Sequence, residues 1–497
     1  MSLDFMTADE AARFVHNDDT VGFSGFTPAG CPKVLPHAIA KYAEEEHQAG
    51  RPFQITMVTG ASTGDRTDGE LARAKAVKRR FPYQSNKSLR QLINSGETEY
   101  IDMHLSILAQ ELRYGFYGKV DVAIVEAAEV TPEGEIVPTT AVGILPTICE
   151  MADRIIVELN DKHPKEIRGL HDICELADPP HRQSIDISKP EDRIGRDHVK
   201  VDPKKIVAVV RTSEPNDDSA FTPVDEVTAA IGTNVANFLA NEIREGRIPE
   251  SFLPLQSGVG NVANAVLGAM GDNEEIPPFK IYTEVIQDAV IRLMKQGKVT
   301  FASGCSLSVS RDCILDIYKD LPYFKERLVL RPQEFSNNPG IVRRLGVISI
   351  NTAIEADIYG NINSTHITGT KMMNGIGGSG DFTRSAYISI FTTPSVAKDG
   401  NISCFVPMVS HTDHTEHSVN VIVSEQGVAD LRGKSPRERA ECIIENVVHP
   451  DYRENLRQYL DICGPGQTRH NLAACFEYHR QFMDKGTMKD VDWSKFR

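Results

Sequence analysis

The sequence predicts an α/β fold of mostly parallel sheets, arranged as two tandem copies of one domain. Short apolar strands alternate with helical patterns along the chain, which is typical of doubly wound parallel sheets. Glycine-rich turns precede helices in both halves, and three short segments of the first half recur in order in the second. A chain of 497 residues also exceeds what one hydrophobic core organises. We therefore expect one domain over residues 1–218 and another over 219–497.

The first half is predicted to begin with a short helix at Thr7, because Thr7 and Glu10 have the spacing of a capping box. Apolar, β-prone runs predict strands at residues 20–24, 54–59, 120–125, 154–158 and 205–210. The first strand runs into the glycine turn 25–30 and a helix over 33–46. The polar, proline-containing segment 161–199 predicts a long surface excursion, and 213–218 an interdomain linker.

The second half is predicted to start with a helix over 225–244 and to contain a strand over 279–283. Three of its segments resemble earlier ones: Ser257-Gly258-Val259 resembles Ser24-Gly25-Phe26, residues 353–360 resemble 127–134, and 421–425 resemble 155–158. Only this half carries Glu284 and a further glycine-rich stretch at 374–381. We therefore expect the chemistry in the second domain.

Composition and charge exclude several classes of function. A net charge of −15 argues against a surface for nucleic acid or anionic membranes, which requires clustered basic residues. The nine cysteines are scattered without a metal-like spacing, which indicates reduced thiols. The N-terminus has no basic segment followed by an apolar core, and no apolar run approaches about 18 residues. We expect a soluble, cytoplasmic protein.

Glu284 lies where the predicted strand gives way to a helical pattern that includes Val285 and Ile286, the usual position for chemistry in open α/β sheets. One interpretation is dinucleotide binding, because Gly258-x-Gly260-x-x-Ala263 fits the Rossmann fingerprint and Glu284 could bind a ribose. Pro254 makes the preceding segment a poor central strand, which weakens this hypothesis of an NAD-dependent dehydrogenase. A structural interpretation makes Glu284 an acid that caps the first turn of a helix.

Acyl transfer is the other functional interpretation. A carboxylate is a weak nucleophile, but it can attack a thioester because a thiolate leaves easily. The product is a high-energy mixed anhydride, so such a site needs oxyanion donors in a dry pocket and binding energy from a remote part of the substrate. Glycine-rich turns bring backbone N–H groups close to an oxyanion or a diphosphate, and the second half has two of them.

Several motifs resemble the acetyl-CoA hydrolase/transferase family, a class I CoA-transferase family, and especially its succinate CoA-transferases. The motifs lie in order along nearly the whole chain, at residues 24–30, 59–62, 256–265, 282–287, 336–340, 355–360, 374–381 and 424–427. The resemblance implies two CoA-transferase-type (NagB/RpiA-like) domains and a homodimer. It implies no prosthetic group and a coenzyme A thioester as substrate. Succinate, acetate and propionate are the acids expected.

The resemblance also implies a role for each matching residue. Glu284 would attack acyl-CoA to give an acyl-glutamyl anhydride and then a glutamyl-CoA thioester. The backbone N–H groups of Val259 and Gly378 would face the oxyanion, and Asn337 and Glu425 would lie close to the nucleophile. The residues expected to bind coenzyme A are Gly258, Val259, Gly260, Asn261, Val262, Ile354, Asn374 and Gly378.

Three alternatives stay open from the sequence. Water instead of a carboxylate could resolve the glutamyl thioester, which would make the protein an acetyl-CoA hydrolase. A non-catalytic sensor of CoA or a sugar phosphate on a related scaffold would tolerate loss of Glu284. His411, Asp413, His414 and His417 could hold a structural metal, but their spacing matches no zinc pattern, so we predict no metal site.

Overall fold

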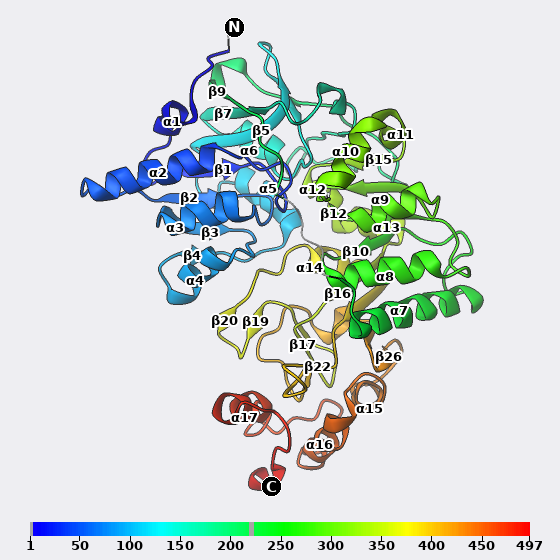
Figure 1. The fold of residues 1–497 in the computed structure, drawn as a ribbon. Coiled ribbons are helices and arrows are strands. Elements are labelled where there is room, and N and C mark those ends of the chain that lie inside the picture. Colours follow the sequence, from blue (N-terminus) through cyan, green and yellow to red (C-terminus); the bar gives the residue numbers. More distant parts are fainter. Residues whose placement is uncertain (1–2, 218–222) are drawn as a thin grey trace. The chain divides into compact units, whose positions relative to one another are not determined.

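The computed structural model describes residues 3–217 and 223–497, which form two compact units (Figure 1). One unit contains the described part of Met1–Ala220 together with Lys280–Leu345 and Asn374–Asp381. The other contains the described part of Phe221–Phe279 together with Gly346–Met373 and Phe382–Arg497. These units differ from two consecutive halves of the chain. The expected boundary between residues 218 and 219 lies outside the described residues.

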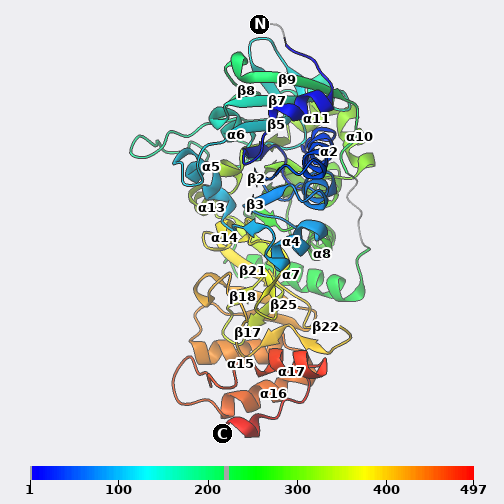
Figure 2. The same ribbon diagram turned by 90° about the vertical axis from the view of Figure 1, so that its left-hand side faces the viewer.

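The first unit is built on a mostly parallel sheet, as the alternating strand pattern predicts. Its strands are β1 (Thr20–Phe23), β2 (Ile55–Val58), β3 (Val77–Phe81), β4 (Glu99–Tyr100), β5 (Val122–Val130), β6 (Glu135–Pro138), β7 (Arg154–Asn160), β8 (Val199–Lys200) and β9 (Ile206–Thr212). The order β4-β3-β2-β1-β5 continues through β7 to β9, all in parallel, while β6 and β8 pair antiparallel at one side. Figure 2 shows β5, β7 and β9 side by side.

Helices cover this sheet, and their apolar residues form one core with the strands. The helices are α1 (Ala8–Ala11), α2 (Leu35–Gln48), α3 (Glu70–Arg73), α4 (Lys87–Ser95), α5 (Leu105–Arg113) and α6 (Leu145–Met151). Thr7 caps α1 with the predicted capping box. Leu35 and Ile39 of α2 pack with Val21 and Phe23 of β1, and all four are fully buried. The predicted order of strand, glycine turn and helix at the start of the chain is therefore confirmed.

The first unit also contains a segment of the second half, Lys280–Leu345, which carries Glu284. Its strands are β11 (Phe279–Tyr282), β12 (Val285–Ile286), β13 (Val299–Gly304), β14 (Ser306–Leu307) and β15 (Leu328–Leu330). Its helices are α9 (Asp288–Lys295), α10 (Arg311–Lys319), α11 (Leu321–Lys325), α12 (Gln333–Ser336) and α13 (Pro339–Leu345). The strands β11, β13 and β15 are neighbours in one sheet, and β12 pairs with β14.

The predicted surface excursion 161–199 is buried over residues 170–174, so that prediction is wrong for this part. Asp172 is almost fully buried and forms an ion pair with Arg331, which is also buried. The N–H of Asp172 donates to the carbonyl of Leu330 (2.9 Å). The prolines and polar residues that marked the segment as a loop are compatible with a buried loop when its backbone groups find partners.

The second unit holds the remaining parallel strands, β10 (Leu255–Ser257), β16 (Ile348–Thr352), β21 (Ile388–Thr392) and β25 (Val421–Ser424), with β26 (Gly427–Asp430) antiparallel at the end. Its helices are α7 (Glu226–Arg244), α8 (Asn261–Asp272), α15 (Pro436–Asn446), α16 (Pro450–Asp461) and α17 (Glu477–Lys485). The last three share a core around Tyr452, Tyr459 and Tyr478 and lie together in Figure 2. Short strands form three small sheets: β17 (Glu355–Asp357) with β18 (Ile362–Asn363) and β24 (Phe405–Val406), β19 (His366–Ile367) with β20 (Lys371–Met372), and β22 (Val396–Ala397) with β23 (Ile402–Ser403).

The strand order β10-β16-β21-β25 repeats β1-β5-β7-β9, with parallel neighbours in both series. β7 therefore corresponds to β21. The sequence comparison had matched residues 155–158, in β7, to residues 421–425, in β25, and that match is wrong. The α/β class with mostly parallel sheets is confirmed. No helix within residues 3–217 and 223–497 is long and apolar enough to cross a membrane.

Candidate active site

The backbone of Glu284 is fixed by neighbours on both sides. The N–H of Thr283 donates to the carbonyl of Ser303 (2.9 Å), and the carbonyl of Glu284 accepts the N–H groups of Cys305 (2.7 Å) and Ser306 (3.0 Å). Val285 and Ile286 then form strand β12, and helix α9 begins only at Asp288, with Gln287 as its N-cap. The predicted helix at Val285 and Ile286 is therefore wrong, and so is the interpretation of Glu284 as a helix cap. The β-branched pair follows its strand partner β14 rather than the helical spacing.

The carboxylate of Glu284 contacts the side-chain amide of Asn337 and lies beside the backbone of Gly378. Asn337 Nδ2 donates to Glu284 Oε1 (3.0 Å). A Cβ built on Gly378 would lie 2.1 Å from Glu284 Oε1 and 2.4 Å from Asn337 Nδ2, so a side chain at this position would displace both groups. The structure thus brings together three predicted residues, Glu284, Asn337 and Gly378.

A second carboxylate, that of Asp381, lies on the other side of Asn337. Asp381 Oδ2 accepts from Asn337 Nδ2 (3.3 Å) and from the N–H of Ser106 (3.0 Å), and Oδ1 accepts from Ser106 Oγ (2.6 Å). Ser106 belongs to the first turn of α5, where the backbone N–H groups have no acceptor within the helix and favour a negative charge. Asp381 therefore links the second glycine loop to a helix of the N-terminal half.

Burial dominates the electrostatics of this site. Loss of solvation raises the pKa of Glu284 to about 7, although the hydrogen bond from Asn337 works in the opposite direction. Burial also raises the pKa of Asp381 to about 7, and the charge of Glu284 contributes to that increase. The pKa of Tyr83 rises to about 12 through burial and the charges of Glu284 and Asp102. Burial raises the pKa of Cys305 above its ordinary range, so its thiol stays protonated.

The loop Asn374–Asp381 is held against residues of the N-terminal half. The N–H of Ile376 donates to both carboxylate oxygens of Asp102 (2.9 and 3.0 Å). A Cβ on Gly375 would lie 2.3 Å from the hydroxyl of Tyr100, and one on Gly380 would lie 2.3 Å from the ring of His104. Asn374, a predicted CoA ligand at the start of this loop, is partly exposed and donates to the carbonyl of Gly375 (2.9 Å). The glycines permit the close approach that brings Gly378 to Glu284.

The other predicted CoA ligands belong to the second unit. Gly258 and Val259 follow strand β10, and Gly260, with φ of +108°, leads into α8, which begins with Asn261 and Val262. Val259 is 57% exposed, which is unusual for valine. Ile354 is partly exposed and lies between β16 and β17.

Glu425 also belongs to the second unit, directly after β25. Its carboxylate accepts from the N–H of Ser395 (2.8 Å), from the hydroxyl of Ser395 and from Gln426 Nε2 (3.1 Å). These donors fix the position of the carboxylate in the unit.

Pro254 does not prevent a strand before the glycine turn, contrary to the expectation from the sequence. The strand β10 starts at Leu255, directly after the proline, and pairs with β16 in parallel. The carbonyl of Pro254 accepts the N–H of Ile348 (2.9 Å), so the residue takes part in the sheet through the one backbone group it can offer. The missing strand was thus an incorrect reason for disfavouring dinucleotide binding.

The sequence did not assign a role to Asp381, Ser106 or Tyr83. Asp381 ends the glycine-rich stretch. Its place directly after several glycines was the only feature of the sequence that could have indicated a role for it. Ser106 and Tyr83 lie in the N-terminal half, and nothing in their local pattern indicates that they approach residues about 200 to 280 positions later. Such contacts arise from tertiary structure, which a single sequence does not display.

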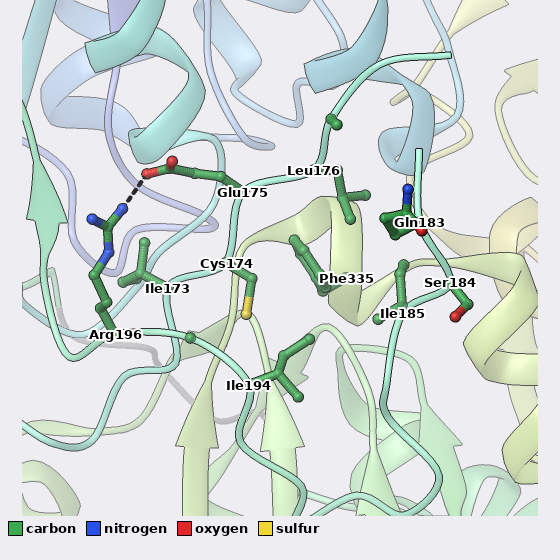
Figure 3. A pocket seen from close by; sticks show the side chains of 12 residues that line it. Ile173, Cys174, Glu175, Leu176, Gln183, Ser184, Ile185, Ile194, Arg196 and Phe335 are labelled. Carbon is green, nitrogen blue, oxygen red and sulfur yellow. Dashed lines mark hydrogen bonds and ion pairs between the residues drawn. The ribbon is translucent and has the colours of Figure 1, made fainter. Parts of the chain in front are cut away.

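A cavity of about 510 Å³ lies between the excursion 161–199 and α12 (Figure 3). Phe335 forms one wall, and Glu175 and Arg196 pair at the side (2.6 Å). Its lining residues are Ile173, Cys174, Glu175, Leu176, Ala177, Gln183, Ser184, Ile185, Ile194, Gly195, Arg196 and Phe335. This lining contains none of the predicted site residues.

In the second unit, His411, one of the histidines that suggested a metal site, contacts an acid and another histidine. His411 Nε2 lies 3.4 Å from Asp413 Oδ1, and the rings of His411 and His366 are tilted by 35° with their centroids 4.0 Å apart. Asp413 Oδ2 accepts from the N–H of Ser364 (2.7 Å). In the part of the chain that the structure describes, no group of three or more His, Cys, Asp or Glu side chains could hold a metal ion.

Family models match most of the chain. The acetyl-CoA hydrolase/transferase N-terminal domain matches residues 3–211, and the C-terminal domain of the same family matches residues 316–460. The chain belongs to the acetyl-CoA hydrolase/transferase family. Glu284 lies between the two matched segments, in a region that full-length relatives cover. Family membership, and not the form of the glycine turn, now argues against the dehydrogenase hypothesis.

Curated members of the family align along almost the entire length. The chain is 50% identical over 483 residues to the propanoyl-CoA:succinate CoA transferase of Escherichia coli, covering 97% of this chain and 98% of the relative. It is 50% identical over 490 residues to the succinyl-CoA:acetate CoA-transferase of Clostridium kluyveri, covering 97% and 90%. An acetyl-CoA hydrolase of Schizosaccharomyces pombe is 42% identical over 500 residues, covering 97% and 95%.

Solved structures support the fold. RipA from Yersinia pestis superposes with a TM-score of 0.70 at 22% identity, over 92% of this chain and 96% of that chain. A 4-hydroxybutyrate CoA-transferase from Porphyromonas gingivalis gives a TM-score of 0.62 at 22% identity, over the same shares. At this identity the likeness establishes the fold alone.

Proposed function

We propose that this family member is a CoA-transferase that moves CoA between a short-chain acyl-CoA and a small carboxylate, with Glu284 as the nucleophile. The contact of the Glu284 carboxylate with Asn337 Nδ2 and the bare backbone of Gly378 carries this proposal. The names of the two relatives at 50% identity support succinate, acetate and propionate as the class of acid.

The reaction consists of two exchanges at the same carboxyl group. A Glu284 oxygen attacks the thioester carbon, the C–S bond breaks and CoA leaves as a thiolate, which gives an acyl-glutamyl anhydride. The thiolate then attacks the glutamyl carbon, the bond between that carbon and the bridging oxygen breaks, and the acid leaves as a carboxylate that retains this oxygen. An incoming carboxylate reverses these steps, so the kinetics are of the ping-pong type.

The surroundings of Glu284 suit this sequence. Both tetrahedral intermediates carry an oxyanion, which backbone N–H groups stabilise best where water is excluded. Gly378 presents backbone beside the reacting carboxylate, and Val259 is the second donor that we propose. Asn337 orients Glu284 by its hydrogen bond. Glu425, held by Ser395, would steer the nucleophile or tune its charge once substrate is bound.

The loop Gly258–Val262 is the proposed CoA site. It leads into α8 and includes its first two residues; the first N–H groups of this 12-residue helix favour an anion such as a diphosphate. Ile354, Asn374 and Gly378 would line the path of the CoA chain. Nothing beyond the substrate's own CoA would be required, and the active assembly would be a homodimer, which sedimentation analysis tests directly.

Hydrolysis is the second candidate function, because the Schizosaccharomyces pombe relative at 42% identity is named an acetyl-CoA hydrolase. The two activities differ only in the acceptor that resolves the glutamyl thioester. Release of CoA without added acid, at a rate equal to transfer with acid, would favour the hydrolase. Dependence of turnover on succinate or acetate would favour the transferase.

Trapping the covalent intermediate tests the proposed nucleophile. The protein is incubated with acetyl-CoA alone, treated with borohydride or hydroxylamine, and digested for mass spectrometry. We expect modification at Glu284 in the wild-type protein and no such modification in Glu284→Ala. Full turnover by Glu284→Ala, or an unmodified Glu284 in a protein that turns over, would refute the proposal and would favour a non-covalent mechanism or a binding protein.

A further inference from the structure

Asp381 stands beside the proposed nucleophile in a buried network that the transfer steps above do not use. Its side chain is almost fully buried, with 3% of the residue's surface exposed. Three donors hold the carboxylate: the N–H and the hydroxyl of Ser106, and Asn337 Nδ2. These charge-assisted hydrogen bonds fix the position of the carboxylate.

Asn337 couples Asp381 to Glu284. Ser336 Oγ donates to Asn337 Oδ1 (2.8 Å), which fixes the orientation of the amide and turns its Nδ2 group toward the two acids. That one group donates to Glu284 Oε1 at 3.0 Å and to Asp381 Oδ2 at 3.3 Å. The two carboxylates therefore approach each other from opposite sides of a single donor group.

When both Glu284 and Asp381 are ionised, their negative charges repel each other, and no ion pair offsets this repulsion in the described residues. The titratable side chains that face the pair are Tyr83 from the loop after β3, Asp102 and His104 from the segment before α5, and Cys305 from the turn between β13 and β14. Arg90 of α4 acts on Tyr83. Within residues 3–217 and 223–497, neither Glu284 nor Asp381 forms an ion pair with a lysine, arginine or histidine.

We propose that Asp381 is a positioning residue whose negative charge, present when its carboxyl group is ionised, repels the free Glu284 carboxylate and thereby favours the neutral, covalently modified forms of Glu284. This inference rests on the proposed function. Acyl-CoA and the Glu284 carboxylate give a free acid carboxylate and a glutamyl-CoA thioester, so the negative charge leaves Glu284 with the product. The repulsion from Asp381 ends at that moment, which shifts the equilibrium toward the thioester.

The variant Asp381→Asn tests the inference, because it removes the charge and keeps the shape of the side chain. Without the repulsion, Glu284 loses its proton more readily, so the acid limb of kcat/KM should move about one pH unit lower. The equilibrium fraction of glutamyl-CoA thioester at fixed acetyl-CoA and acetate should fall about tenfold, since one pKa unit corresponds to a factor of ten. Both quantities are measured on the full-length protein, by pH-dependent kinetics and by mass spectrometry of the intact chain.

Two further variants separate charge from structure. Ser106→Ala keeps the Asp381 side chain but removes the hydroxyl donor that stabilises its ionised form. Asp381 is then charged less of the time, so we expect the acid limb and the thioester fraction to shift in the same direction as in Asp381→Asn. Asp316→Asn removes a half-exposed acid on α10 that pairs with Lys295, and it should leave both the kinetics and the acid limb unchanged. If Asp381→Asn does not fold, a fall of the thioester fraction in Ser106→Ala supports the inference, and a fraction equal to that of the wild type overturns it.

The outcomes distinguish this inference from the proposed function. An unmodified Glu284 in active wild-type protein refutes the proposed function and the inference with it. A modified wild-type Glu284, together with an Asp381→Asn protein whose acid limb and thioester fraction match the wild type, overturns the inference alone. A loss of activity in Asp381→Asn without either shift would assign Asp381 a purely structural role and would also overturn it.

Discussion

Glu284 is costly to bury as an anion, and this has a measurable effect on stability. Its folded-state pKa of about 7 lies above the ordinary value of 4.5, so between these pH values the folded protein binds more protons than the unfolded chain. The contribution of Glu284 to the free energy of unfolding is therefore most favourable near pH 4.5 and decreases as the pH rises toward 7.

The variant Glu284→Gln should remove this pH dependence. We expect it to be more stable than the wild type by about 3 kcal/mol at pH 8, with the difference vanishing near pH 4.5. Urea denaturation at both pH values measures the difference. A Gln variant that is less stable than the wild type at pH 8 would contradict the assigned cost of burial.

Gly378 is the position where one methyl group should affect activity most. In Gly378→Ala the new Cβ would overlap Glu284 Oε1, so the nucleophile must leave its hydrogen bond with Asn337. We expect kcat to fall by about a hundredfold, since a displacement of about 1 Å has such effects, while the melting temperature changes little. The matched control is Gly268→Ala in α8, where nothing lies within 4 Å of the added Cβ and activity should be retained.

At the scale of elements, the two glycine turns lead to helices that are used differently. Glu158 accepts the N–H groups of Lys33, Val34 and Leu35 at the start of α2, so a side chain of the protein occupies that anion site. At the corresponding place before α8, the turn 258–260 is partly or fully exposed. The repeated strand, turn and helix thus has an internal carboxyl group in one copy and an accessible turn in the other, in agreement with the chemistry expected in the second half.

Glu158→Ala should destabilise the protein by about 2–3 kcal/mol, because it leaves buried N–H groups without an acceptor. Equilibrium denaturation in urea measures this change. Glu166→Ala, on the exposed surface of the same half, serves as the control and should stay within about 0.5 kcal/mol of the wild type. Equal stability of the two variants would show that α2 does not depend on Glu158.

The elements that depend on residues close together in the sequence were predicted correctly, and those that depend on distant residues were not. The capping box at Thr7, the strand before Glu284 and the helix over 225–244 depend on neighbouring residues, and the structure agrees with them. The helical spacing of Val285 and Ile286 failed, because strand β14, about 20 residues later, supplies their pairing partner. Asn337 and Gly378 were predicted through family motifs, whereas Ser106 and Tyr83 were missed because only tertiary contacts bring them to the site.

At the scale of the whole molecule, the excursion 161–199 is secured to the second-half segment by a buried ion pair. Asp172 contacts Arg331 and also accepts the N–H groups of Ile194 and Gly195 (3.0 and 2.6 Å). Asp172→Ala would leave the Arg331 guanidinium buried and unpaired by this acid, which should cost about 3–5 kcal/mol. Chemical denaturation measures this loss.

The control for Asp172→Ala is Glu175→Gln, which breaks an exposed ion pair with Arg196 in the same excursion. Exposed pairs contribute about 0–1 kcal/mol, so this variant should be nearly as stable as the wild type. A small effect of both substitutions would mean that the buried pair is not what secures the excursion.

The composition of the first unit has a consequence for biosynthesis. Glu284 is translated long before Gly378 and Asp381, yet all three belong to one unit whose N-terminal residues, such as Ser106, are made first. A ribosome that has made the first 345 residues has therefore produced the nucleophile without the backbone that faces it. The chain cannot be divided after residue 222 into an inert half and an active half, because each fragment would lack part of the constellation around Glu284.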